Sequence, residues 1–205
     1  MAYFPFMVDI SGMSCLIAGG GKVAAGKVET MLDFGALVTV VAPEITEGLH
    51  VLARNCQEGS LILRQRKVKE EDILMADMVI LATDDEAVNA RMAMLAREHK
   101  IPVNVVDAKA DCSFYFPAIL RQKDVVVAVS TGGKSPLLAR EIKKEIRENI
   151  REDYGDIAET MGKNREQVLE QVADGKMRKK VFGEMLKEAL DGNAKSENPH
   201  RHQGK

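Results

Sequence analysis

Three small residues near the start of the chain have the spacing of turns that bind the pyrophosphate of a dinucleotide. Gly19, Gly21 and Ala24 follow the form G-x-G-x-x-G/A, with alanine in the last place. The first glycine allows a tight turn, the second lets a pyrophosphate approach the backbone, and the small third residue lets the helix pack closely on the strand. The N-terminus of that helix offers free N–H groups and about half a positive charge to the phosphates.

Several acidic residues follow apolar runs and are candidates for acid–base chemistry. Asp107 comes directly after the run at 103–106, where an acid either caps the next turn, or accepts a proton or helps to hold a metal. Asp84 and Asp85 follow the run at 78–82 and either cap the next helix at its N-terminus or take part in catalysis. Both interpretations stay open on the residues alone.

A second glycine turn, at residues 130–136, gathers groups suited to binding carboxylates. These are hydroxyls, flexible glycines and a positive charge, on Ser130, Thr131, Gly132, Gly133, Lys134 and Ser135. The alternative is a turn that only joins a strand to a helix. A P-loop is disfavoured, because Ala128 stands where that motif requires glycine and Pro136 follows the Gly-Lys-Ser at once. Arg140 and its basic neighbours either face solvent or form a wall for an acidic substrate.

The candidates follow continuous apolar runs that are typical of strands buried on both faces of a parallel sheet. The expected strands span residues 15–18, 37–41, 61–63, 78–82 and 103–106. Apolar residues with helical spacing lie between them, over 24–32, 45–56 and 88–95. This alternation predicts a doubly wound α/β domain of Rossmann type, with a parallel sheet, over residues 1–113. Because ligands of such sheets bind beyond the carboxyl ends of the strands, the candidate loops are expected to converge on one crevice.

The pattern changes after residue 113. A strand is expected at 125–129, followed by the second glycine turn and a helix over 136–149 with Ser135 as N-cap. Polar helical sequence fills 151–192, with a break between two helices at Asp174 and Gly175. The expected domains are therefore a dinucleotide-binding domain over 1–113, a segment over 114–150, a small helical domain over 151–192 and a disordered tail over 193–205.

Composition and charge exclude several classes of protein. The 205 residues carry a formal net charge of −2, which gives no support to nucleic-acid binding. No apolar run approaches the length of a membrane span, and the first residues do not resemble a signal peptide. The three cysteines are an odd number and fit a reducing compartment, so a cytoplasmic protein is expected. His99, Asp111 and Cys112 lack the spacing of metal ligands, so no bound metal is expected.

The residues after the second expected strand bear on the choice of cofactor. An acid about 20 residues beyond the first glycine usually holds the ribose hydroxyls. Here Pro43 closes the strand and the first acid is Glu44, so ribose contacts are left to Glu44 or to backbone groups. No arginine or lysine stands there to meet a 2′-phosphate, which favours NAD over NADP.

Together these segments resemble the precorrin-2 dehydrogenases of siroheme synthesis, which occur as free-standing proteins and as the N-terminal part of siroheme synthase. The matching segments are 4–6, 15–24, 38–43, 82–85, 104–107, 113–114, 117–118, 127–136 and 138–140. They run in unbroken order over residues 1 to about 150, and such a set is far more specific than any one motif. The methyltransferase part of the longer fusion is not expected in this chain.

The resemblance implies NAD-dependent oxidation of precorrin-2 to sirohydrochlorin, and some members of the family then insert Fe²⁺. It also implies a homodimer, with 114–150 as the dimerisation and substrate-binding segment. Asp107 matches the aspartate that is essential in the family, and the segments around Lys22-Val23 and Pro43-Glu44 match its NAD contacts. The family also lacks the ribose acid, so its absence here does not count against NAD.

The expected catalytic residue is thus Asp107. The expected cofactor-binding residues are Gly19, Gly21, Lys22, Val23, Ala24, Pro43, Glu44, Thr83 and Asp84. The expected substrate-binding residues are Ser130, Thr131, Gly132, Gly133, Lys134, Ser135 and Arg140. Two other functions stay open. A non-enzymatic NAD sensor would share the first glycine turn but need neither Asp107 nor the second turn, and another NAD-dependent dehydrogenase would act on a small carboxylate.

Overall fold

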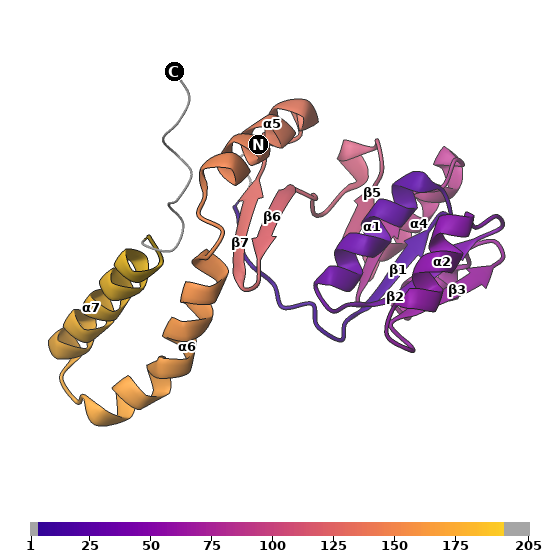
Figure 1. Ribbon diagram of the computed structural model, residues 1–205. Coiled ribbons are helices and arrows are strands. Elements are labelled where there is room, and N and C mark those ends of the chain that lie inside the picture. Colours follow the sequence, from indigo (N-terminus) through magenta and orange to yellow (C-terminus); the bar gives the residue numbers. More distant parts are fainter. Residues whose placement is uncertain (1–3, 195–205) are drawn as a thin grey trace, which may run out of the picture. The chain divides into compact units, whose positions relative to one another are not determined.

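The computed structural model describes residues 4–194 and consists of two compact units (Figure 1). The first unit ends at Phe116 and the second begins at Pro117. Residues 195–205, which make up most of the expected tail, lie outside the described residues. Among the helices of the described part, none combines the length and the apolar character needed to cross a membrane.

The first unit is built on a five-stranded parallel sheet with the order β3-β2-β1-β4-β5. Its strands are β1 (Ser14–Ala18), β2 (Leu37–Ala42), β3 (Leu61–Gln65), β4 (Met78–Leu81) and β5 (Val103–Val105). The helices between them are α1 (Lys22–Asp33), α2 (Glu47–Asn55), α3 (Glu70–Leu74) and α4 (Glu86–Glu98). All five expected strands and the doubly wound Rossmann-type fold are confirmed.

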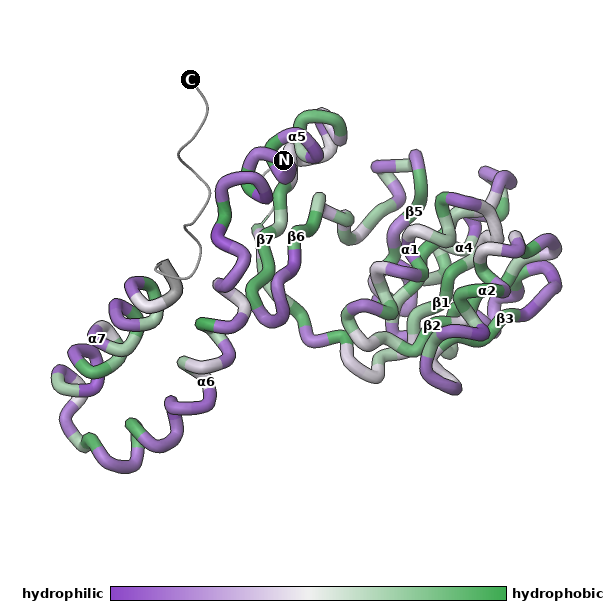
Figure 2. The backbone as a smooth tube through the Cα atoms, in the orientation of Figure 1, coloured by the Kyte–Doolittle hydropathy of each residue, from purple (hydrophilic) through white to green (hydrophobic). Residues whose placement is uncertain are grey.

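Each face of this sheet carries its own hydrophobic core, because successive strand side chains point to opposite faces. On one face Cys15 packs with Val28 of α1 and Leu49 of α2. On the other face Leu16 packs with Met92 of α4, and α3 joins the same cluster. Figure 2 shows the resulting hydrophobic colour along β1 and β2. Burial on both faces explains why the strands are continuous apolar runs in the sequence.

Three short elements were not expected from the sequence. They are α3, the 3₁₀ turn η1 (Lys109–Asp111) and the strand β6 (Ala118–Gln122). In α3 only Asp72 and Ile73 are buried, and in β6 only Leu120 is. One or two buried residues give no repeat that distinguishes a helix from a strand.

Over residues 117–194 the second unit combines a hairpin with three helices. In the hairpin, β6 pairs antiparallel with β7 (Val125–Val129). The helices are α5 (Pro136–Asn149), α6 (Tyr154–Gln171) and α7 (Gly175–Ala194). Ser135 caps α5 as predicted, since its Oγ accepts a hydrogen bond from the Leu138 N–H at 3.1 Å. The predicted break at Asp174 and Gly175 is confirmed between α6 and α7.

The start of α6 packs against the hairpin turn. A Cβ on Gly155 would lie 2.7 Å from the Gln122 carbonyl oxygen, so glycine permits this approach. Lys123 in the turn pairs with Asp156 at 2.6 Å and with Glu159. Hydrogen bonds from Lys123 and from Lys163 lower the pKa of Glu159 to about 2. The ion pairs of Lys123 thus connect α6 to the hairpin of its own unit.

Candidate functional site

The candidate loops of the first unit lie along one edge of the sheet, beyond the carboxyl ends of the strands. Backbone hydrogen bonds join two of these loops to neighbouring strands: the Gly19 N–H donates to the Val41 carbonyl of β2 at 3.0 Å, and the Ala82 N–H donates to the Ala18 carbonyl of β1 at 2.7 Å. The chain reverses its direction of sheet growth between β1 and β4. The topological switch point therefore lies between the glycine turn and the loop that begins at Ala82, where such folds bind ligands.

The first two glycines of the turn are required by packing. Gly19 has a φ of +127°, and a Cβ there would lie 2.3 Å from the Ala82 carbonyl oxygen. A Cβ on Gly20 would lie 2.0 Å from the Glu44 carbonyl oxygen. Gly21 differs, because nothing lies within 4 Å of its Cβ position. The turn is thus tightly packed at two glycines and open at the third, where a ligand can approach the backbone.

The N-terminus of α1 is available to an anion. The N-cap Gly21 has no side chain to cap the helix, and the first turn contains no acid. The N–H groups of Lys22, Val23 and Ala24 have no intrahelical partner, because helical hydrogen bonds reach back four residues. Lys22 and Val23 are exposed, and Ala24 is buried at 1% exposure against the sheet. The donors and the helix dipole fit a pyrophosphate.

The loops on either side of the glycine turn supply further candidates. Pro43 and Glu44 follow β2 and are exposed, and the Glu44 backbone contacts the turn. Thr83 is held by the buried Asn89, whose Oδ1 accepts from the Thr83 hydroxyl at 2.7 Å and whose Nδ2 donates to the Thr83 carbonyl at 2.9 Å. Asn89 was not among the predicted site residues. The backbone of the Thr83 loop is therefore fixed at the switch point.

The two acids after β4 have different roles. Asp85 is the N-cap of α4, and its carboxylate accepts a hydrogen bond from the Val88 N–H at 3.0 Å. The capping interpretation is thus confirmed for Asp85. Asp84 is exposed beside it, at the same edge of the sheet.

Asp107 lies in the turn after β5 with its side chain exposed. Its φ of 60° is left-handed, a conformation that costs an L-residue about 1 kcal/mol and that aspartate adopts more readily than most. Within residues 4–194 no hydrogen bond or ion pair engages its carboxylate, and the N-cap of η1 is Ala108. The capping interpretation is therefore wrong for Asp107, and its carboxylate is available to accept a proton.

The chain beyond Asp107 folds back over β5 through residues that the sequence analysis missed as site residues. Asn104 is buried in β5, and its Nδ2 donates to the Phe114 carbonyl at 3.0 Å. At the end of this segment the Phe116 ring lies 3.7 Å from the Lys27 ammonium of α1. Burial lowers the pKa of Lys27. The sequence does single out Asn104, because it is the one polar residue in the apolar run 103–106.

The second glycine turn belongs to the second unit and is stabilised by its own hydroxyls. Thr131 Oγ1 accepts from the Ser135 N–H and donates to the Ser135 carbonyl, both at 3.0 Å. Ser130 Oγ accepts from the Gly132 N–H at 3.2 Å. Gly132 and Gly133 have φ values of 62° and 74°. The glycines are thus needed for the backbone of the turn. Lys134 and Arg140 are exposed near it.

The sheet, the open glycine turn and the switch point together define a dinucleotide-binding domain of Rossmann type. The chain belongs to the family described as "Putative NAD(P)-binding", which matches residues 6–118. A second family, "Sirohaem biosynthesis protein central", matches residues 127–149, which include the second glycine turn and α5.

Relatives of this chain carry names from the same pathway. It is 41% identical over 187 residues to siroheme synthase of Nitrosospira multiformis, covering 91% of this chain and 40% of the relative. It is 39% identical over 186 residues to siroheme synthase of Methylococcus capsulatus, covering 91% and 39%. The chain thus spans about two fifths of these relatives. A solved structure named "SirC, precorrin-2 dehydrogenase" matches with a TM-score of 0.72 and 28% identity over 89% of each chain. The resemblance found in the motifs is confirmed.

Proposed function

We propose that this chain catalyses the NAD-dependent oxidation of precorrin-2 to sirohydrochlorin. One observation carries the proposal: Asp107, with no partner for its carboxylate within residues 4–194, stands at the same sheet edge as the uncapped glycine turn. A phosphate-binding turn alone suits a sensor as well as an enzyme. An available base at the same end of the sheet suits an enzyme, because the oxidation removes a proton as well as a hydride.

The residues of the first unit have separate tasks in this mechanism. The first-turn N–H groups of α1 hold the pyrophosphate, and the open position at Gly21 lets it approach. NAD, when bound, accepts the hydride. Asp107 accepts the proton, and its exposed position after β5 lets it reach a substrate at the carboxyl edge of the sheet. Lys22, Val23, Ala24, Pro43, Glu44, Thr83 and Asp84 complete the proposed cofactor site.

The second unit is proposed to hold the carboxylates of the substrate through residues 130–135 and Arg140. The hydroxyls of Ser130 and Ser135 accept backbone N–H bonds, and a hydroxyl that accepts retains a hydrogen to donate. Lys134 and Arg140 add exposed positive charges. A polycarboxylate such as precorrin-2 needs donors and cations of this kind.

A homodimer is proposed on the hairpin of the second unit. A two-stranded sheet is marginally stable by itself. Here Val125, Val126 and Val127 of β7 are only partly buried, and Leu137 is 75% exposed at the start of α5. A second copy of the chain would cover these surfaces, and sedimentation equilibrium checks the mass.

The three cysteines are free thiols, which supports a reducing, cytoplasmic compartment.

Insertion of Fe²⁺ into sirohydrochlorin is proposed as a second step, with Fe²⁺ as a substrate. The relatives named siroheme synthase support it, since siroheme is the iron-containing product. The macrocycle supplies the four nitrogens that bind the metal, so the protein has only to accept protons, and Asp107 is suited to that task. Siroheme formation faster with enzyme than without it would support the step, and equal rates would refute it.

The experiment that tests the dehydrogenase is incubation with precorrin-2 and NAD⁺, followed through NADH formation. We expect Asp107→Ala to lower turnover by about 10²- to 10⁴-fold, the usual contribution of a positioned base, with NAD⁺ affinity unchanged. Glu98→Gln is the matched control, because this exposed acid ends α4 at the opposite edge of the sheet. Unchanged turnover in Asp107→Ala would remove its catalytic role. NAD⁺ binding by the wild type without NADH formation would favour a sensor.

A further inference from the structure

The segment after Asp107 returns along the outer edge of β5, the last strand of the sheet. Ser113 pairs with Val103: its N–H donates to the Val103 carbonyl at 2.8 Å, and its Oγ accepts from the Val103 N–H at 2.8 Å. The Cys112 side chain likewise contacts both the N–H and the carbonyl of Val105. The Val105 N–H donates to Cys112 Sγ at 3.2 Å, and Sγ lies 3.2 Å from the Val105 carbonyl oxygen.

The Cys112 thiol also closes the turn that contains Asp107. Its Sγ lies 3.4 Å from the carbonyl oxygen of Ala108, the residue after Asp107, and Asn104 Nδ2 donates to it at 3.6 Å. The thiol therefore contacts the backbone on both sides of Asp107. A left-handed aspartate persists only where surrounding contacts hold it there. Cys112 supplies such contacts to the backbone on either side of Asp107, whose own side chain makes no hydrogen bond or ion pair within the described residues.

We propose that Cys112 is a positioning residue for Asp107, which acts by fixing the backbone of Val105 and Ala108 on either side of the catalytic aspartate. This inference rests on the proposed function, in which Asp107 accepts the proton. The thiol does not touch the substrate in this scheme. It sets the conformation from which the carboxylate meets the reacting atom, and a misplacement of about 1 Å at such a group can cost about 100-fold in rate.

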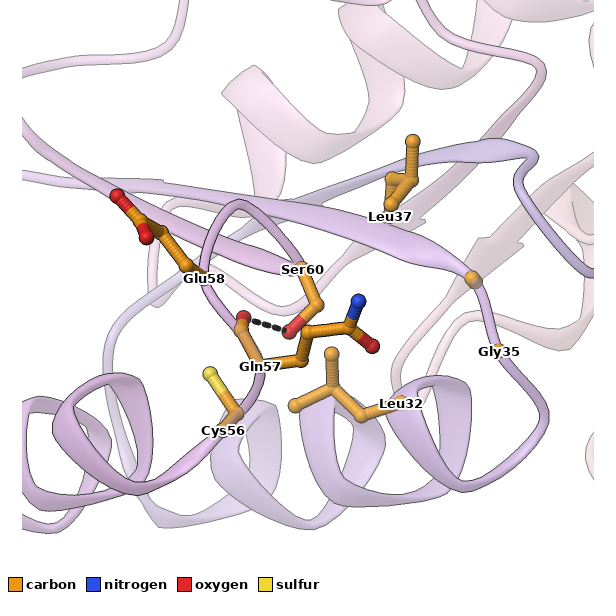
Figure 3. Close-up of a pocket in the computed structure, with 8 residues that line it drawn as sticks. Leu32, Gly35, Leu37, Cys56, Gln57, Glu58 and Ser60 are labelled. Carbon is orange, nitrogen blue, oxygen red and sulfur yellow. Dashed lines mark hydrogen bonds between the residues drawn. The ribbon is translucent and has the colours of Figure 1, made fainter.

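Two substitutions of Cys112 separate its role in positioning Asp107 from a role in packing alone. Serine keeps one donor and one acceptor at nearly the same place, whereas alanine removes both. Cys56→Ala is the matched control. Cys56 is likewise partly buried, and its Sγ donates to the Ala53 carbonyl at 3.5 Å. It lines the pocket of Figure 3 together with Leu37, which starts β2, and it therefore lies at the amino ends of the strands, away from Asp107.

The experiment measures turnover of precorrin-2, NAD⁺ affinity and amide hydrogen exchange in the full chain. We expect Cys112→Ala to lower kcat about 10-fold, within the range for a displaced catalytic group, and to leave the NAD⁺ Kd unchanged. We expect Cys112→Ser to keep most of the wild-type kcat and Cys56→Ala to keep all of it. The Val105 amide exchanges faster in Cys112→Ala than in the wild type or in Cys112→Ser. In an Asp107→Ala background, Cys112→Ala causes no further loss, because it acts through Asp107.

The outcomes separate the positioning role of Cys112 from the proposed function of the chain. A wild type that oxidises precorrin-2, with equal kcat in Cys112→Ala, would overturn the positioning role and leave the proposed function standing. A further loss on top of Asp107→Ala would also overturn it, because Cys112 would then act by another route. A wild type that forms no NADH would refute the proposed function itself. Unchanged exchange at Val105 in Cys112→Ala would refute the structural basis whatever the activity.

Discussion

The two glycine turns of this chain each join a strand to a helix, yet they differ in whether a side chain caps the N-terminus of that helix. The turn before α1 places glycines against backbone carbonyls and leaves the helix without a side-chain cap. The turn before α5 places glycines at positive φ, and Ser135 caps the helix. The first turn therefore leaves its N–H groups to a ligand or to solvent, whereas the second turn satisfies one of its own N–H groups.

The difference supports the proposal that the two turns bind different ligands. An uncapped terminus concentrates N–H donors and the helix dipole on one anion, which fits a pyrophosphate. A capped turn with fixed hydroxyls presents separate donors on a rigid backbone, which fits several carboxylates of one substrate.

The largest effect is expected at the open glycine of the first turn. Gly21→Asp places a carboxylate at the proposed phosphate site, so bulk and like-charge repulsion should weaken NAD⁺ binding at least about 100-fold, or about 2.7 kcal/mol. Because its Cβ position is empty, the free energy of unfolding should change little. Gly26→Asp adds the same charge to an equally open position of α1 and serves as control. Calorimetric titration measures both variants, and normal NAD⁺ affinity in Gly21→Asp would remove the first turn as the cofactor site.

A smaller effect is expected where the glycines serve the fold. Gly20→Ala forces a Cβ to within 2.0 Å of the Glu44 carbonyl oxygen and should cost about 2 kcal/mol of the free energy of unfolding. Gly132→Ala, in the second turn, places a side chain at a left-handed backbone position and should cost about 1 kcal/mol. Urea denaturation compares them. Equal losses would mean that packing does not distinguish the two turns.

The cap of the second turn should contribute less than the packing of the first. Ser135→Ala removes the hydroxyl that accepts from the Leu138 N–H and should lower the free energy of unfolding by about 1 kcal/mol. Ser135→Thr keeps the cap and should retain most of the stability. Thermal unfolding measures the loss, and NAD⁺ titration should show no change. Weaker NAD⁺ binding in Ser135→Ala would show that the two turns do not have separate ligands.

A pH-dependent effect is expected at α3, where the Asp72 carboxylate accepts hydrogen bonds at the start of the helix. Hydrogen bonds from Arg66, both at 2.6 Å, lower the pKa of Asp72, which also accepts from the Lys69 N–H at 2.9 Å. A lowered pKa in the folded state gives stability that is present above the unfolded pKa of about 4 and is lost as pH falls through the folded pKa. Asp72→Asn should therefore differ most from the wild type at neutral pH and converge with it in acid. A difference in the free energy of unfolding that stays constant with pH would contradict this.

The sequence was sufficient to predict the elements whose apolar residues form runs or recur at a regular spacing. The five parallel strands and the glycine turn followed from apolar runs and spacing, and the cap at Ser135 followed from its place before Pro136. A sheet buried on both faces requires such runs, so its sequence is strongly constrained. The edge at which the candidate loops meet could be predicted because it depends only on strand direction.

Other parts of the site could not be predicted, because they depend on contacts between residues without a regular spacing. Nothing in the sequence indicates that Cys112 contacts Val105, or that the carboxylate of Asp107 has no partner within the described residues. The positive φ of Asp107 is likewise a product of the folded loop. Asn89 and Asn104 were predictable only as polar exceptions among apolar neighbours, which does not give their partners.

The pairing of Ser113 and Cys112 with β5 also affects how the protein behaves toward other chains. A bare strand at the end of a sheet is a template for intermolecular β-pairing and aggregation. At Val103 and Val105 the outward backbone groups are already engaged by these two residues. The segment that orients Asp107 thus also protects this edge, and a variant that loosens it should become more prone to form insoluble assemblies at high concentration.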